Sequence, residues 1–276
     1  MTIQEALTYG RNFLKEHSIS YDIDAKLLLM DILNINKVQL LTTTDNITHS
    51  NFSRYENYLN RRKNKEPIAY ILNHIYFMNM KFYVNENVLI PRGDTEILVY
   101  KAIDEIKLKS FKKLLDIGTG SGCIPIAIGK SVNILSTAVD ISTKALAVAI
   151  ENAEYHNLKI NFIESDLFTN INEKFDIITS NPPYITNSEM LELMDDVINF
   201  EPHLALEGGL DGLDFYRKIC NEGIDYLENN GLLIFEIGYN QGEDLKNIMS
   251  LNFYDITLIK DLQGHDRVIF GYKKEI

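Results

Sequence analysis

Cysteine is scarce in this chain, and long apolar stretches are absent. Cys123 and Cys220 lie far apart, and neither belongs to a Cys-x-x-Cys or Cys/His pattern. We therefore expect no disulfide framework and no structural zinc, and a reducing compartment fits. The longest nearly unbroken apolar stretch, Leu232–Ile237, is far shorter than the ~20 residues that span a bilayer. Residues 1–18 lack the apolar core of a secretory signal, so we expect a cytoplasmic protein without a membrane partner.

Basic residues are also few, and they are unevenly distributed. The chain has 27 Lys and Arg against 39 Asp and Glu, a net charge of −12. Residues 1–75 carry nine basic and eight acidic residues, so the remainder carries 18 basic and 31 acidic, a net charge of −13. An acidic body repels phosphate backbones. Stable binding of DNA or RNA is therefore not expected, although a local basic patch could act against the total.

The composition is that of an ordinary globular protein. Of 276 residues, 45% are hydrophobic and 24% are charged, a length that suits one large domain or two ordinary ones. Apolar residues in 1–73 recur at spacings of three and four, which predicts a small helical bundle. Short aromatic and β-branched runs with Asn-rich turns predict a β-hairpin linker over residues 74–90.

Beyond Pro91 the pattern alternates between strands and helices. Helices are expected at 95–106, 142–156 and 241–251, and strands at 113–117, 134–140, 160–164, 175–180, 232–237, 256–260 and 268–272. Strands separated by helices pair in parallel through crossover connections. We therefore predict an α/β domain over residues 91–276, with a mostly parallel, seven-stranded sheet whose ligands bind at the carboxyl ends of the strands.

The segment LLDIGTGSGC places a glycine-rich loop between a strand and a helix. Glycine permits positive φ and lets the backbone approach a ligand closely. A dinucleotide fingerprint beginning at Gly118 would require glycine where Cys123 stands, and an acid precedes the first glycine, so a pyrophosphate ligand is disfavoured. The pattern resembles the S-adenosylmethionine loop of Rossmann-like methyltransferases, although such a loop can also be a simple strand–helix turn. The predicted cofactor residues here are Asp116, Gly118, Thr119, Gly120, Ser121 and Gly122.

Acids end the next two strand regions. Asp140, 24 residues after Asp116, can accept both ribose hydroxyls of an adenosine group. Asp166 matches the acid that often approaches the adenine amino group, and Leu167 beside it can pack against the adenine face. A solvated loop acid is the alternative reading of Asp166.

The tetrapeptide NPPY follows the predicted strand 175–180. Its two prolines stiffen the loop, which would fix the Asn181 side chain and the Pro182 carbonyl as hydrogen-bond acceptors. Two acceptors on a planar NH₂ group orient it and stabilise the charge that develops during methyl transfer. Tyr184 would offer a flat face, and Pro183 would complete the substrate-binding loop. An amide or an exocyclic amine of adenine, cytosine or guanine could be the acceptor, and the chemistry requires no metal; a plain strand-end turn is the remaining alternative.

Several further segments resemble the HemK-like family, the N5-glutamine methyltransferases of class 1 peptide chain release factors. They are PIAYIL at 67–72, VLIPRGDTE at 88–96, NPPYI at 181–185, EPHLALEGGLDGL at 201–213, EIGYNQ at 236–241 and GHDRV at 264–268. The resemblance implies methyl transfer from S-adenosylmethionine to the glutamine of a Gly-Gly-Gln motif, with S-adenosylhomocysteine as product. Together with the chemistry of the NPPY loop, this predicts Asn181, Pro182 and Tyr184 as the catalytic residues.

The chain departs from that family at a few positions. Gly93 stands where proline is usual, Asn73 and Asn79 stand where glycine is usual, and Leu167 replaces a frequent tryptophan. Asparagine tolerates the left-handed region, so the hairpin should survive. Leu167 offers less stacking to an adenine.

Two other functions stay open at this point. One is a nucleic-acid amine methyltransferase, which the acidic charge of residues 76–276 disfavours. The other is a non-catalytic cofactor-binding partner of the translation machinery, which the intact NPPY disfavours. We expect a monomer whose bundle, with the cationic run 61–63, contacts the release factor; the bundle could instead only stabilise the catalytic domain.

Overall fold

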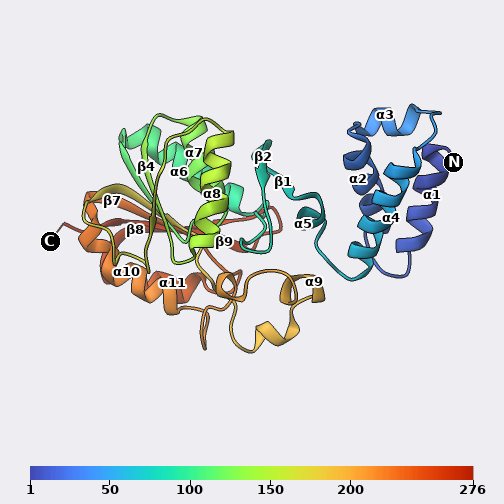
Figure 1. Cartoon of the computed structure of the whole chain (residues 1–276). Coiled ribbons are helices and arrows are strands. Elements are labelled where there is room, and N and C mark those ends of the chain that lie inside the picture. Colours follow the sequence, from blue (N-terminus) through green and yellow to red (C-terminus); the bar gives the residue numbers. More distant parts are fainter. Residues whose placement is uncertain (276) are drawn as a thin grey trace. The chain divides into compact units, whose positions relative to one another are not determined.

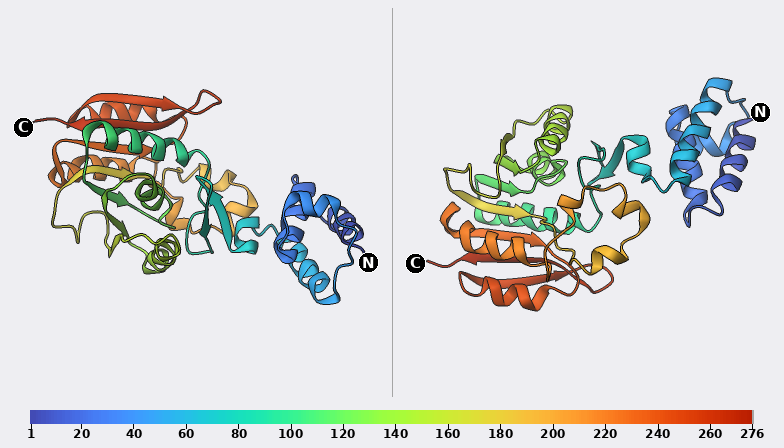
Figure 2. Two further views of the ribbon diagram at one scale, coloured as in Figure 1. Left: turned by 90° about the horizontal axis from the view of Figure 1, so that it is seen from above. Right: turned by 60° about the horizontal axis from the view of Figure 1, so that its bottom comes forward.

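The computed structural model describes residues 1–275, which form two compact units (Figures 1 and 2). The smaller unit contains Met1–His74 and Met194–Phe200, and the larger contains Ile75–Leu193 and the chain from Glu201 onward. The sequence predicted a helical domain that ends at residue 73 and a separate linker that ends at residue 90. The structure differs in two ways: the segment Met194–Phe200 belongs to the helical unit, and the hairpin strands belong largely to the larger unit. No helix within residues 1–275 is long and apolar enough to cross a membrane.

The smaller unit is the expected helical bundle. α1 begins with a capping box, in which Thr2 Oγ1 accepts the Glu5 N–H at 3.1 Å and the Glu5 carboxylate accepts the Thr2 N–H at 2.8 Å. Apolar stripes at helical spacing converge on a core that includes Leu7, Leu28 and Tyr55, each at most 1% exposed. The helices are α1 Ile3–Leu14, α2 Tyr21–Leu33, α3 Lys37–Thr42, α4 His49–Lys63 and α5 Ile68–Leu72, with α9 Asp195–Ile198 from the later segment.

The β-hairpin is shorter than the sequence suggested. β1 His74–Phe77 and β2 Met80–Tyr83 are joined at Asn79, whose φ of +58° is a conformation that asparagine tolerates. The strands end at Tyr83 because Asn85 starts a turn, with its side-chain oxygen accepting the Asn87 N–H at 3.0 Å. The hairpin is fixed within the larger unit by Asn152, which accepts the Tyr83 N–H at 2.7 Å and donates to the Tyr83 carbonyl at 2.9 Å.

The larger unit contains a seven-stranded sheet with the order β5-β4-β3-β6-β7-β9-β8. Five strands are parallel, and β9 lies antiparallel between β7 and β8. The strands are β3 Lys113–Ile117, β4 Leu135–Asp140, β5 Asn161–Glu164, β6 Phe175–Ser180, β7 Leu227–Glu236, β8 Phe253–Lys260 and β9 Asp266–Lys273. The predicted α/β domain with a mostly parallel, seven-stranded sheet is thus confirmed.

Helices cover both faces of this sheet (Figure 1). Neighbouring residues on a strand point to opposite faces, so Leu114 packs in the core under α6 and α7 whereas Leu115 packs under α10 and α11. The helices are α6 Thr95–Lys109, α7 Cys123–Ser131, α8 Thr143–Tyr155, α10 Asp214–Tyr226 and α11 Gly242–Met249, with the 3₁₀ turns η1 Glu189–Glu192 and η2 His203–Ala205. Because the five strands β3–β7 run in the same direction, their carboxyl ends meet at one edge of the sheet.

Candidate active site

A pocket of about 330 Å³ lies at the carboxyl ends of β3, β4 and β6. All residues that line it belong to the larger unit. Predicted site residues from three separate loops and from the end of β4 meet there. Those that line the pocket are Gly118, Thr119, Gly120, Ser121, Asp140, Asp166, Leu167, Asn181, Pro182 and Pro183.

The glycine-rich loop exposes its backbone to the pocket. Gly118 and Gly120 have φ of +67° and +54°, values that favour glycine. A Cβ built on either residue would have no described atom within 4 Å. This open space lets a bound molecule approach the backbone closely.

Gly122 has a different role from the other two glycines. Its φ is +77°, and a Cβ there would lie 3.1 Å from the Ile126 Cδ1 and 3.2 Å from the Ala149 Cβ. The residue therefore lets α7 and α8 pack closely together. Of the described residues predicted to bind the cofactor, Gly122 and Asp116 lie outside the pocket lining.

Asp140 is positioned by two backbone N–H groups. Its Oδ2 accepts the Gly120 N–H and its Oδ1 accepts the Ser142 N–H, each at 2.9 Å. Burial raises the pKa of this carboxyl, although the two N–H donors act against that shift. Each oxygen keeps a lone pair that can accept a further hydrogen bond from the pocket. The carboxylate is thus both an anchor of the glycine-rich loop and a fit for a vicinal diol.

Asp116 lies beneath the loop and is fully buried. Its Oδ1 accepts the Thr179 hydroxyl at 2.7 Å, whereas its Oδ2 has no hydrogen-bond partner among the described residues. Burial raises the pKa of Asp116 to about 7. An unsatisfied buried carboxyl oxygen beside a ligand loop fits a cationic ligand or a bridging water.

Ser165 shapes the loop after β5. Its hydroxyl donates to the Leu167 carbonyl at 2.9 Å and accepts the Asn170 N–H at 3.0 Å. Leu167 has a φ of +49°, an unusual value for a non-glycine residue. Asp166 is exposed, and both Asp166 and Leu167 reach the pocket. Their predicted adenine contacts stay predictions.

The NPPY loop leaves β6 at the pocket. The Ser180 hydroxyl donates to the Ile117 carbonyl at 2.8 Å and so fixes the end of β6 to β3. Asn181 and both prolines line the pocket. Tyr184 is not one of the described residues that line it, and its side chain packs against the core under α10 and α11. Burial raises the pKa of Tyr184 to about 12, so its hydroxyl stays protonated at neutral pH. The predicted flat contact of Tyr184 with the acceptor stays a prediction.

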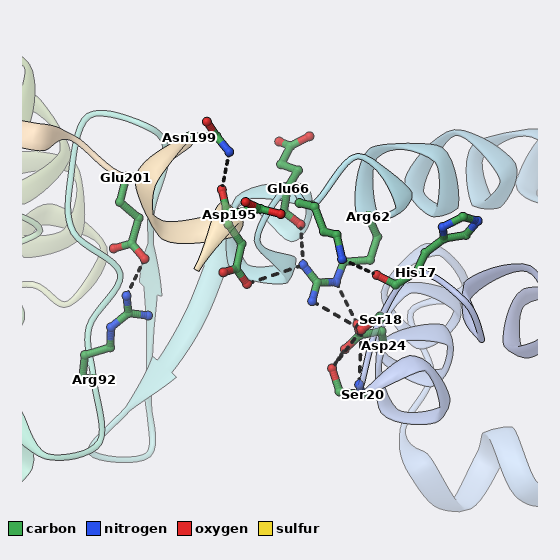
Figure 3. A network of polar contacts seen from close by, with 12 residues as sticks. His17, Ser18, Ser20, Asp24, Arg62, Glu66, Arg92, Asp195, Asn199 and Glu201 are labelled. Carbon is green, nitrogen blue, oxygen red and sulfur yellow. Dashed lines mark hydrogen bonds and ion pairs between the residues drawn. The ribbon is translucent and has the colours of Figure 1, made fainter. Parts of the chain in front are cut away.

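Glu201 and Arg92 form a pair that the sequence did not predict (Figure 3). The Glu201 side chain is 1% exposed; its Oε1 accepts from Arg92, and its Oε2 accepts the Ile90 N–H at 3.3 Å. Arg92 lines the pocket, as does Pro202. The buried carboxylate therefore anchors the segment before α6 at the pocket wall.

Asp266 and Arg267 are neighbours at the start of β9, yet they pair with different partners. Asp266 pairs with Lys260 at 2.7 Å, and Arg267 pairs with Asp261 and Asp94, both at 3.2 Å. Residues next to each other on a strand point to opposite faces and cannot pair.

Glu236, at the end of β7, is 2% exposed. Its Oε2 has no hydrogen-bond partner among the described residues. Burial raises its pKa to about 7, and a hydrogen bond with the Thr95 side chain and the positive charge of Arg267 act against that shift.

The cationic run in the helical unit is engaged by neighbours in that unit. Arg61 forms a two-pronged contact with Glu66, at 2.8 Å from Nε and 2.5 Å from an Nη. Arg62 donates to the Asp24 carboxylate at 2.8 Å (Figure 3), and a second contact runs to Asp196 at 3.8 Å. These arginines therefore have most of their charge compensated within the unit.

Comparisons with known proteins first define a class. The methyltransferase small domain family matches residues 95–211. A solved methyltransferase from Pyrococcus furiosus covers 72% of this chain and 91% of its own with a TM-score of 0.53 at 20% identity. The catalytic domain of hMettl16 covers 83% of both chains with a TM-score of 0.57 at 14% identity. Fold, pocket and family match thus define a Rossmann-like methyltransferase.

Full-length relatives identify the family. The PrmC N-terminal domain matches residues 5–72. A release factor glutamine methyltransferase from Clostridium botulinum is 42% identical over 284 residues, which cover 99% of this chain and all of that protein. One from Thermodesulfovibrio yellowstonii is 40% identical, covering 94% of this chain and 95% of that protein. The chain belongs to the release factor glutamine methyltransferase family.

Proposed function

We propose that this protein transfers a methyl group from S-adenosylmethionine to the side-chain amide nitrogen of the glutamine in the Gly-Gly-Gln motif of class 1 peptide chain release factors. The observation that carries the proposal is one pocket lined by both Asp140 and the Asn181-Pro182 pair. A cofactor end and an acceptor end thereby share a single cavity. Family membership supports both the reaction and the substrate.

The cofactor end of the pocket fits S-adenosylmethionine. Asp140 keeps free lone pairs for two ribose hydroxyls, and the open backbone at Gly118 and Gly120 leaves room for the methionine portion. The Asp116 carboxyl, with its unsatisfied Oδ2, lies beneath that portion, and a cation bound there would favour its ionised form against the effect of burial. The bound cofactor supplies a methyl group on a positively charged sulfur. Asp166 and Leu167 would hold the adenine.

The acceptor end orients a weak nucleophile. The lone pair of an amide nitrogen is delocalised into its carbonyl, so the nitrogen needs help to attack. The Asn181 side-chain oxygen and the Pro182 carbonyl would accept its two N–H bonds and stabilise the positive charge that develops on nitrogen. Because the two prolines hold these acceptors in fixed positions, binding of the amide also aligns its nitrogen for attack. As the new C–N bond forms, the nitrogen gives up one of its two protons to water, and S-adenosylhomocysteine is the other product.

Selection of one glutamine requires contacts beyond this pocket, because glutamine amides occur on nearly all proteins. A stable contact with a folded partner buries roughly 1,200–2,000 Å² in total. The helical unit offers an exposed apolar row for this purpose: Ile23 and Leu27 lie one turn apart on α2 and are 59% and 38% exposed, and Ile19, in the turn before this helix, is 105% exposed. We therefore assign release-factor docking to this row, since Arg61 and Arg62 are engaged within the unit.

The experiment offers several acceptors in parallel. The protein is incubated with radiolabelled S-adenosylmethionine and with a release factor, the same factor with its Gly-Gly-Gln glutamine changed to alanine, a free Gly-Gly-Gln peptide, DNA or RNA. We expect label on the intact release factor, weaker label on the peptide and background elsewhere. Preferential labelling of DNA or RNA would contradict the proposal, and so would equal labelling of the altered factor.

A further inference from the structure

Gln241 is a buried amide behind the NPPY loop. It directly precedes α11 and is 6% exposed, although its side chain caps no N–H of that helix. A buried polar side chain is costly unless its hydrogen bonds are satisfied. The partners of Gln241 therefore indicate what the residue does.

Three loops supply those partners. Gln241 Nε2 donates to the Tyr184 carbonyl and to the Gly212 carbonyl, each at 3.2 Å. Its Oε1 accepts the Gly238 N–H at 2.9 Å. The side chain thus uses its NH₂ group as a donor twice and its oxygen as an acceptor once. With the amide oxygen and nitrogen exchanged, the oxygen would face two carbonyl oxygens and the NH₂ group would face the Gly238 N–H. One side chain joins the NPPY loop, the loop before α10 and the loop after β7.

The NPPY loop depends on such outside contacts. Pro182 and Pro183 have no N–H, so the loop cannot be held by donors of its own at these positions. Beyond Tyr184, the Ile185 N–H donates to the Leu206 carbonyl at 3.0 Å, and the Ile185 carbonyl accepts the Gly208 N–H at 2.8 Å. Gln241 adds a fixed point at Tyr184, the residue directly after the two prolines.

The loop that contains Gly208 and Gly212 packs closely against this contact and leaves no room for a side chain at either glycine. A Cβ on Gly212 would lie 2.3 Å from the Tyr184 carbonyl oxygen and 2.7 Å from the Gln241 Nε2. A Cβ on Gly208 would lie 2.7 Å from the Tyr184 Cα. Both glycines let the backbones approach, so the Gln241 amide sits where two loops already touch.

We propose that Gln241 is a positioning residue for methyl transfer. Through the Tyr184 carbonyl its amide sets the location of the Asn181 side chain and the Pro182 carbonyl, which would hold the acceptor amide. Alignment of reacting groups tolerates small displacements poorly, and an error of about 1 Å can cost roughly 100-fold in rate. Gln241 does not line the cofactor pocket within the described chain, so its effect should fall on turnover and not on cofactor affinity. This inference rests on the function proposed above.

The test uses two variants and a matched control in the full-length protein. Gln241→Met keeps the length of the side chain and removes all three hydrogen bonds; Gln241→Glu keeps an acceptor for Gly238 and replaces the donors by oxygen. Gln263→Met makes the same replacement at an exposed turn, where the backbone N–H of Gln263 donates to Asp261 and would be kept in the variant. Calorimetry with S-adenosylhomocysteine gives the affinity and the fraction of binding-competent molecules, and turnover on the release factor is expressed per competent molecule.

We expect both Gln241 variants to bind S-adenosylhomocysteine within about twofold of the parent protein and to lose about 10- to 100-fold in kcat. Gln263→Met should match the parent in both measurements. Parent-like kcat in Gln241→Met would overturn the inference. So would loss of cofactor binding in proportion to activity, because Gln241 would then maintain the fold. Failure of the parent protein to methylate the release factor would instead refute the proposed function, which keeps the two claims separate.

Discussion

Replacing Asp140 by alanine perturbs the cofactor end of the pocket in two ways. It removes the acceptor proposed for two ribose hydroxyls, and it frees the Gly120 and Ser142 N–H groups, each now bonded at 2.9 Å. A hydrogen bond to a charged group contributes about 1.5–3 kcal/mol, and part of the loss is recovered when water reaches the vacated site. We expect binding of S-adenosylmethionine to weaken by about 1–3 kcal/mol, or roughly 5- to 150-fold in Kd.

A cofactor analogue separates the ribose contact from the loop anchor. Calorimetry compares S-adenosylhomocysteine with its 2′,3′-dideoxy analogue on the parent protein and on Asp140→Ala. The parent should prefer the intact ribose by about tenfold or more, and the variant should lose most of that preference because its partner is gone. If the variant still discriminates as strongly as the parent, Asp140 does not hold the ribose and its role is confined to anchoring the loop.

Three further predictions address the acceptor end, a buried acid and the helical unit. Asn181→Ala should lower kcat on the release factor by about 100-fold or more while calorimetry shows S-adenosylhomocysteine affinity almost unchanged; near-normal turnover would remove Asn181 from the acceptor site. Because Glu236 has a folded pKa raised from 4.5 to about 7, the native state binds more protons than the unfolded state between these values, so its contribution to stability falls as pH rises from 4.5 to 7. Glu236→Gln should lack this loss, so by pH 8 its free energy of unfolding in urea should have risen by up to about 3 kcal/mol relative to that of the parent. Parallel curves of unfolding free energy against pH would contradict the raised pKa. The double variant Ile23→Ser, Leu27→Ser should raise KM for the release factor and leave activity on a short Gly-Gly-Gln peptide unchanged; an unchanged KM for the factor would exclude docking at this row.

The strands of the sheet and the two motif loops could be predicted because their signals are local. β3 and β6 have the predicted bounds, since each is a buried apolar run that ends at a polar loop. Parallel strands bring their carboxyl ends to one edge, so the topology alone brings Asp140 and Asn181 to the same pocket. The sequence therefore predicted the fold class and the edge of the sheet at which Asp140 and Asn181 meet.

Partners distant in the sequence could not be predicted. Glu201 accepts from Arg92, which lies 109 positions earlier, and Gln241 donates to Tyr184, which lies 57 positions earlier. Neither pair has a spacing that marks it, because the contact depends on how two loops pack. Gly122 belongs to the same motif as Gly118, yet it meets Ala149 of α8. Helix packing, which a motif does not encode, separates their roles.

The most direct test of the account is the site of methylation on the release factor. The full-length protein is incubated with S-adenosylmethionine and an unmethylated class 1 release factor, and the peptide that contains the Gly-Gly-Gln motif is sequenced by tandem mass spectrometry. The account predicts a single added methyl group on the side-chain nitrogen of that glutamine, and none when Asn181→Ala is used under the same conditions. A methyl group on another residue, or an unmodified motif beside an active enzyme, would contradict it.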